Sequence, residues 1–256
     1  MTPLLLKNFL TKIEKDSATV KKQSLILAKE ELHDFFKNAP NDEKRFLVRK
    51  AVAIIGYFGG LRCAELVALN FEDVSISKDC ITVFIRSSKT DPQGKSKFYF
   101  TIPKDNDASS LCAYSIIQKY FDAVPKKSGR FFINCNTKSN SFAGQPMGRN
   151  TIGAVPKFIA SYLELDNADK YTGHCFRRSS ATALADSGAT LTTLKRQYRW
   201  KSDSVALDYV DQSKTHKMDV AKSLKITTCA DINTTNKEDN ATKIVHISNC
   251  SNVINL

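Results

Sequence analysis

The chain has 256 residues, with 38 Lys and Arg against 26 Asp and Glu, and a formal net charge of +12. Hydrophobic residues make up 42% of the sequence, which is enough for a packed core and excludes a largely disordered chain. The longest uncharged apolar run, residues 51–61, falls well short of the roughly 20 residues that cross a bilayer, so we expect no membrane span. The positive excess indicates a polyanionic partner.

The N-terminal segment and the cysteines indicate the compartment. A leucine cluster at residues 4–6 has no positive region before it and no cleavage site after it, so it predicts no signal peptide. The seven cysteines are odd in number, and their spacing matches no zinc or redox motif. We therefore expect free thiols, no bound metal, and a soluble intracellular protein that would be nuclear in a eukaryote.

The N-terminal half alternates between helical and strand patterns. Its longest helix would begin at Asn41 as N-cap and end at Gly59 and Gly60. Runs of Val, Ile, Phe and Tyr then predict strands of a small antiparallel sheet, with a Pro- and Gly-containing turn at 89–94 between two of them. We predict helices over about 3–14, 28–36, 41–57 and 62–69, and strands over 80–86 and 97–102.

The C-terminal half is mostly helical in pattern. Phe131–Ile133 predicts a brief buried strand or turn, and the Asn- and Thr-rich residues beyond Ile226 predict a flexible tail. The expected fold class is mainly α with a small antiparallel β-sheet (α+β). We predict helices over about 108–123, 149–163, 172–187, 190–199 and 203–210.

The first candidate motif for chemistry is Gly60–Leu66, with the sequence Gly-Leu-Arg-Cys-Ala-Glu-Leu. It places Arg62 at the start of a helix and Glu65 three residues later on the same face, where the carboxylate can hold the guanidinium. An ordinary surface ion pair is the alternative interpretation.

The second motif, His174-Cys175-Phe176-Arg177, places an imidazole and a guanidinium one helical turn apart. Two such groups can bind the oxygens of a single phosphate, although a capping or core histidine has the same pattern. Arg178 points about 100° away from Arg177 and fits a surface or DNA-backbone contact better.

A third candidate pair follows near the end of the helical region. Trp200, the one tryptophan of the chain, has an indole N–H that can reach a phosphate oxygen. Tyr209 follows nine residues later on a short amphipathic helix, where a packing role in the core is the alternative.

In this order and with these intervals, the motifs resemble the tyrosine recombinase, or phage integrase, superfamily. The resemblance covers about residues 28–215 and implies the catalytic-domain fold of that family. The tryptophan in place of a second histidine, and the turn at Ser87–Asp91, are most similar to the crypton group of eukaryotic mobile elements. The matching catalytic positions are Arg62, Lys89, His174, Arg177, Trp200 and Tyr209, with Glu65 supporting Arg62.

The resemblance implies a mechanism that needs no metal or other cofactor. Tyr209 would attack a DNA phosphodiester to give a 3′-phosphotyrosyl link and a free 5′-hydroxyl, while two arginines stabilise the charge on phosphorus. Lys89 would protonate the leaving 5′ oxygen, and His174 would be an acid/base or a hydrogen-bond donor. Trp200 would bind the phosphate and brace the helix of Tyr209.

The resemblance also implies partners and domains. The partner would be double-stranded DNA rather than a small molecule, bound by a homotetramer. Residues 1–23 would be a remnant of a core-binding domain with its linker, 24–222 the catalytic domain, and 223–256 a polar tail. Because half of the usual DNA clamp would be missing, we expect weak DNA binding, and the activity of this chain alone is left open.

Two alternatives remain. One is a DNA-binding module whose catalytic residues are present but unused. The other is a type IB topoisomerase, a class that usually has lysine where His174 stands.

The charge distribution fits DNA binding, since residues 170–222 contain ten Lys and Arg against five Asp. The cations predicted to bind DNA are Arg178, Lys195, Arg196, Arg199 and Lys201.

Overall fold

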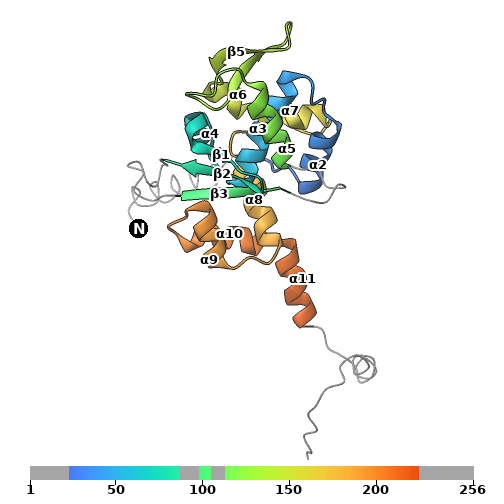
Figure 1. The fold of residues 1–256 in the computed structure, drawn as a ribbon. Coiled ribbons are helices and arrows are strands. Elements are labelled where there is room, and N and C mark those ends of the chain that lie inside the picture. The colour runs from blue at the N-terminus through green and yellow to red at the C-terminus, as the bar shows by residue number, and fades with distance from the viewer. Residues whose placement is uncertain (1–22, 87–97, 105–112, 225–256) are drawn as a thin grey trace, which may run out of the picture. The chain divides into compact units, whose positions relative to one another are not determined.

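The computed structural model describes residues 23–86, 98–104 and 113–224. They form a mostly helical structure with two small antiparallel sheets, which confirms the predicted fold class (Figure 1). The chain divides into two compact units, the first of which ends at His216. The predicted helix at 3–14, the turn with Lys89 and the tail lie outside the described residues. No helix in the described ranges is long and apolar enough to cross a bilayer.

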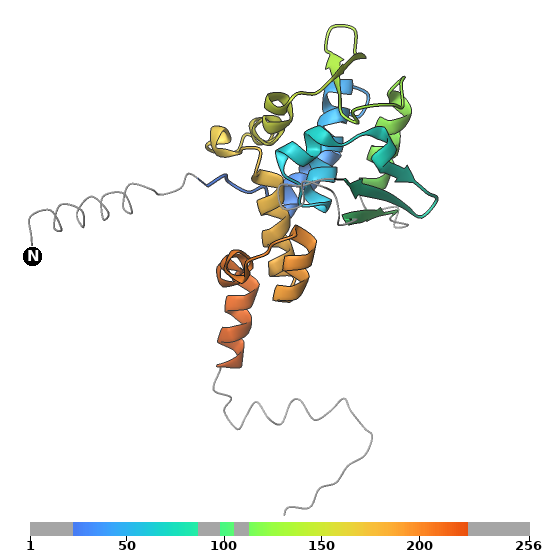
Figure 2. The same ribbon diagram turned by 90° about the vertical axis from the view of Figure 1, so that its left-hand side faces the viewer.

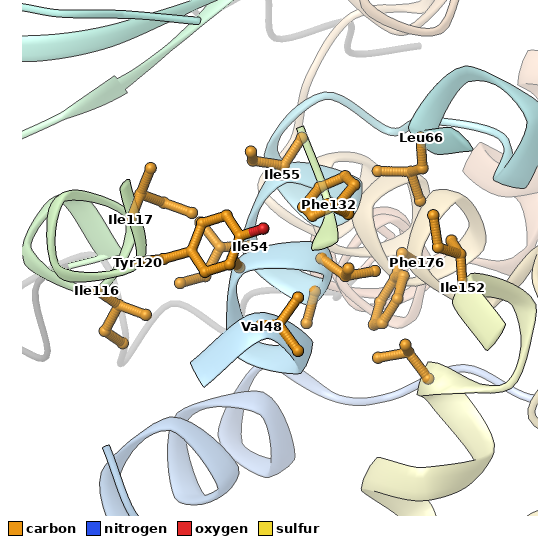
Figure 3. Packing of buried hydrophobic residues seen from close by; sticks show 14 of the residues in the cluster. Val48, Ile54, Ile55, Leu66, Ile116, Ile117, Tyr120, Phe132, Ile152 and Phe176 are labelled. Atoms are coloured by element: carbon orange, nitrogen blue, oxygen red, sulfur yellow. The ribbon is translucent and has the colours of Figure 1, made fainter. Parts of the chain in front are cut away.

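Helix α3 (Lys44–Phe58) is the centre of the main core. It is buried on most of its circumference, as expected for a helix surrounded by others. It contacts α5 (Ala113–Ala123), α7 (Val155–Tyr162) and α8 (Cys175–Asp186). Figure 3 shows its side chains packed between Tyr120 of α5 and Phe176 of α8. Helix α2 (Lys29–Asn38) adds Leu32 and Phe35 to the same core.

The three-stranded sheet has the order β1-β2-β3, with both neighbouring pairs antiparallel. Strands β2 (Cys80–Ile85) and β3 (Phe98–Pro103) confirm the two predicted strands. Strand β1 (Val74–Ile76) was not predicted, because three residues are too short for a recognisable alternation. A separate hairpin pairs β4 (Ile133–Asn136) with β5 (Ser141–Pro146), so the strand expected near 131–133 lies slightly later in the chain.

Two predicted helix boundaries were wrong. Asn41 is not the N-cap of α3: the helix begins at Lys44, and Asn41 instead accepts a hydrogen bond from Lys50. The predicted helix at 149–163 is two helices, α6 (Arg149–Gly153) and α7, divided at Ala154. Pro156 explains the break, because its ring has no N–H to donate and crowds the carbonyl one turn earlier.

The segment after α8 forms a small second core. Helices α9 (Leu191–Tyr198) and α10 (Asp203–Gln212) pack on α8, and the two views of Figures 1 and 2 show the three together. The remaining elements are short or terminal. They are α4 (Cys63–Ala68), the 3-10 helices η1 (Phe71–Asp73) and η2 (Ala168–Lys170), and the unpredicted helix α11 (Lys214–Ser223). The cysteines at 63, 80, 135 and 175 are free, as expected.

Lys50 is fully buried in α3 and fixes the connection between α2 and α3. Its ammonium donates to the carbonyls of Phe36 and Ala39, both at 2.6 Å, and to Asn41 Oδ1 at 2.7 Å. Burial, with a smaller effect of the Lys119 charge, lowers the pKa of Lys50 to about 8. The group is therefore still protonated at pH 7 and uses all three of its N–H donors.

We predict that Lys50→Met lowers the free energy of unfolding by about 2–5 kcal/mol, because a side chain of similar length leaves three acceptors without their donor. Urea unfolding followed by circular dichroism measures the change. Lys37→Met, an exposed lysine of α2, is the matched control and should change stability by about 0.5 kcal/mol or less. An equal effect of the two substitutions would contradict the structural role of Lys50.

Candidate active site

Arg62 and Glu65 form the first part of the site, at the start of α4. The Arg62 backbone N–H donates to Glu65 Oε2 at 2.8 Å, and Arg62 Nη1 donates to Glu65 Oε1 at 3.1 Å. The contact expected from the Arg-x-x-Glu spacing is therefore present. It is no ordinary surface pair, since the Glu65 side chain is only 3% exposed and that of Arg62 only 20%.

Arg177 lies in the first turn of α8 and is buried. Its Nη1 donates to the carbonyl of Gly60 at 2.7 Å, and its Nη2 donates to the carbonyl of Tyr198. Burial, followed by the charge of Arg62, lowers the pKa of Arg177 to about 10, so it stays charged at neutral pH. The guanidinium thus joins the loop before α4 to the end of α9.

His174 is the N-cap residue of α8, one turn before Arg177. Loss of hydration, and then the charges of Arg177, Arg62 and Arg149, lower the pKa of His174 below its ordinary value. The start of α8 thus places the imidazole one turn before Arg177, where the charges of Arg177 and Arg62 both act on it. The lowered pKa favours the neutral form of the imidazole.

Trp200 and Tyr209 complete the site from the other side. Their rings stack with centroids 5.1 Å apart and an interplanar angle of 12°. The Arg177 guanidinium lies 5.6 Å from the Trp200 ring centroid, within cation–π range. Tyr209 is half-buried on α10 and packs against the second core, so the expected bracing of its helix by Trp200 is present.

The five cations predicted to bind DNA lie in different settings. Arg196 and Lys201 are exposed, whereas Lys195 pairs with Asp203. Arg178 donates to Gln23 Oε1 at 2.9 Å and to the Ser24 carbonyl, so both of its terminal nitrogens make a bond within the chain.

Arg199 differs from the surface position expected of it. Its side chain is 11% exposed and its Nη2 donates to both Glu65 oxygens at 3.0 Å. The remaining predicted catalytic residue, Lys89, lies outside the described residues.

Three contributors to the site were missed by sequence reasoning. The carbonyls of Gly60 and Tyr198 act through the backbone, which leaves no side-chain signal. Arg149 begins α6, where its carbonyl accepts a bond from Cys63 Sγ at 3.4 Å and its charge acts on His174. Arg149 comes close to α4 only in the folded chain. In the sequence it belongs to no recognisable motif.

The site carries an excess of buried positive charge. Three guanidinium groups, those of Arg62, Arg177 and Arg199, lie largely buried, and within the described ranges Glu65 is the one carboxylate that bonds to any of them. Buried charges are costly unless they are paired. The arrangement therefore suits an anionic ligand with several oxygens, such as a phosphate held between Arg62, His174 and Arg177.

The chain belongs to the Phage integrase family, whose sequence model matches residues 26–216. It is 27% identical over 168 residues to an integrase/recombinase xerD homolog of Selenomonas ruminantium, covering 66% of this chain and 48% of that protein. It is also 27% identical over 176 residues to the tyrosine recombinase XerC of Syntrophus aciditrophicus (strain SB), covering 67% and 52%. The chain thus spans about half the length of these relatives.

A solved structure supports the fold. The XerH site-specific recombinase, in a post-cleavage complex with its palindromic difH substrate, superposes with a TM-score of 0.55 at 18% sequence identity. The match covers 78% of this chain and 53% of the XerH chain. The predicted tyrosine recombinase catalytic-domain fold is confirmed.

We predict that Gly60→Ala disturbs the site more than an ordinary glycine substitution does. Gly60 has φ +53°, and a Cβ there would lie 2.2 Å from a Tyr198 ring carbon, beside the two carbonyls that hold Arg177. We expect a loss of about 3 kcal/mol or more in the free energy of unfolding, from backbone strain and overpacking together. Urea unfolding measures it.

Gly129→Ala is the matched control, because Gly129 also has a positive φ, +74°, but a Cβ there meets nothing within 4 Å. Gly129→Ala should lower the free energy of unfolding by about 1–2 kcal/mol, from backbone strain alone. If the two variants are equally destabilised, the close approach of Gly60 to Tyr198 is not a constraint on the site.

A second prediction concerns protonation of His174. A bound phosphate favours the imidazolium, so its pKa should rise on binding and a proton should be taken up. DNA affinity should therefore increase as the pH falls through the interval between the two pKa values. NMR titration of the histidine Cε1–H signals, with His174→Gln for assignment, measures both pKa values. A pKa at or above 6.5 in the free protein would contradict the cationic setting.

Proposed function

We propose that this chain is a site-specific DNA recombinase, which cleaves double-stranded DNA and rejoins it to a different strand through a 3′-phosphotyrosyl intermediate on Tyr209. The observation that carries the proposal is a cluster of three arginines, Arg62, Arg177 and Arg199, that Glu65 neutralises only in part. The guanidinium of Arg177 lies against Trp200, which stacks on Tyr209. A phosphodiester brings one negative charge, and its pentavalent transition state brings a second. Fixed cations next to Tyr209 thus favour the transition state over the bound substrate.

The proposed reaction transfers one phosphoryl group. Tyr209 Oη attacks phosphorus in line and releases its proton to water, while the P–O5′ bond breaks and the His174 imidazolium donates a hydrogen bond to a phosphate oxygen. The departing 5′ oxygen takes a proton from Lys89 and leaves as a hydroxyl. Because the tyrosyl ester retains the phosphodiester bond energy, a 5′-hydroxyl from another duplex can reverse the step and exchange strands. Trp200 donates its indole N–H to the phosphate and holds Tyr209 by stacking.

We further propose the partners that the sequence resemblance implies. Arg196 and Lys201 are exposed, lie within four residues of Trp200 in the chain, and suit backbone contacts to duplex DNA. A homotetramer on DNA, membership of the crypton group of mobile elements and, in a eukaryote, a nuclear location belong to the same proposal. Trp200 in place of a second histidine supports the crypton assignment.

A covalent-capture experiment tests the proposed activity. The chain is incubated with nicked duplexes of random sequence, so that the cleaved end diffuses away and the protein–DNA adduct accumulates. Denaturing gels and sequencing of the attached strand then identify the cleavage site. We predict an adduct at a 3′ phosphate that Tyr209→Phe abolishes with DNA affinity retained, because only the attacking hydroxyl is removed.

Two outcomes contradict the proposal. Binding without any adduct indicates an unused catalytic set and a DNA-binding role. Relaxation of supercoiled plasmid without strand transfer indicates a topoisomerase. A full-length relative such as the XerC protein serves as the positive control for capture.

A further inference from the structure

Arg199 has a backbone conformation that its residue type disfavours. It is the C-cap of α9 with φ +54°, in the left-handed region where a Cβ is crowded. Glycine would adopt this conformation without strain. A long charged side chain at such a position therefore requires a compensating interaction elsewhere.

That interaction is with Glu65, 134 residues earlier in the chain. Arg199 Nη2 bonds both carboxylate oxygens, and its guanidinium carbon lies 4.1 Å from the ring centroid of Phe98, the first residue of β3. Its Nε and Nη1 are buried without a hydrogen-bond partner among the described residues. Exclusion from solvent makes Arg199 unsuited to a contact with the DNA surface.

The position of Arg199 in the chain links the parts of the site. The preceding residue, Tyr198, offers its carbonyl to Arg177, and the following residue, Trp200, stacks on Tyr209. Through Glu65, the Arg199 side chain meets the carboxylate that also holds Arg62. One residue thus connects the segment that leads to Tyr209 with α4, the helix whose N-cap is Arg62.

We propose that Arg199 is a positioning residue that acts through Glu65 to bring Arg62 and Tyr209 to the same phosphate. This inference rests on the proposed cleavage activity and replaces the DNA-binding role expected for Arg199. The Glu65 carboxylate accepts hydrogen bonds from both arginines. Loss of Arg199 would leave Glu65 and Arg62 paired with each other but no longer tied to the segment that leads to Tyr209.

Arg199→Gly tests the side chain apart from backbone strain. Glycine adopts the left-handed conformation without strain, while the contact between Arg199 and Glu65 is lost. The substrate is the duplex captured by the wild-type chain, at saturating concentration in single turnover. We expect adduct formation to slow by about tenfold or more, as for a small misplacement of reacting groups, with the DNA dissociation constant within about twofold of wild type. Arg199→Lys, which keeps the charge but not the two-oxygen contact, should restore part of the rate.

Two comparisons attribute the effect to Glu65. In a Glu65→Gln background, Arg199→Gly should slow the reaction by less than about twofold more, because coupled residues are not additive. Glu164→Gly is the matched control, since Glu164 also has a positive φ of 55° and is exposed at the end of α7. It should leave cleavage unchanged, and thermal unfolding of every variant confirms that it is folded.

The outcomes are distinct. A wild-type rate in Arg199→Gly, or independent effects of Arg199→Gly and Glu65→Gln, overturns the inference. So does weakened binding with an unchanged rate, which would return Arg199 to the DNA-binding surface. A wild-type chain that forms no adduct overturns the proposed cleavage activity itself, and the positioning role with it.

Discussion

The Arg177 guanidinium is the contact on which the arrangement of the site depends. It donates to a carbonyl 117 residues before it and to another 21 residues after it, so it fixes two distant turns to the start of α8. The first turn leads directly into α4 and Arg62. The second leads through Trp200 to the helix of Tyr209. A substitution at Arg177 would therefore remove the proposed phosphate ligand and, with it, the connection between these two turns.

Burial of this cation has an energetic consequence. The neighbouring guanidinium groups of Arg62 and Arg199 repel Arg177, and Glu65 compensates only in part. The free site therefore contains electrostatic strain that an anion relieves, which is the usual compromise between stability and activity in a preorganised site. Loss of hydration lowers the pKa of His174, and the charges of Arg177, Arg62 and Arg149 lower it further. The excess of positive charge in the site thus also favours the neutral form of the His174 imidazole.

The sequence predicted the local parts of this site and missed the distant ones. The contact between Arg62 and Glu65 follows from helical spacing, because residues three apart share a face. The order of the motifs identified the family, since a set of matches in register is far more specific than any single one. The pairing of Arg199 with Glu65 was not predictable, because it depends on how α9 returns to α4. Arg199, as a basic residue in a basic region, was instead assigned to the surface.

The second core explains why so many polar contacts converge on α9. Its buried members include three alanines, Ala181, Ala185 and Ala206, which offer little apolar area to hold the helices together. The segment from α9 to α10 therefore depends more on directional bonds than the α3 core does. Gln197 contributes one more, from its Nε2 to the Phe58 carbonyl at 3.0 Å. Directional bonds fix orientation better than apolar burial, and the proposed in-line attack by Tyr209 would depend on orientation.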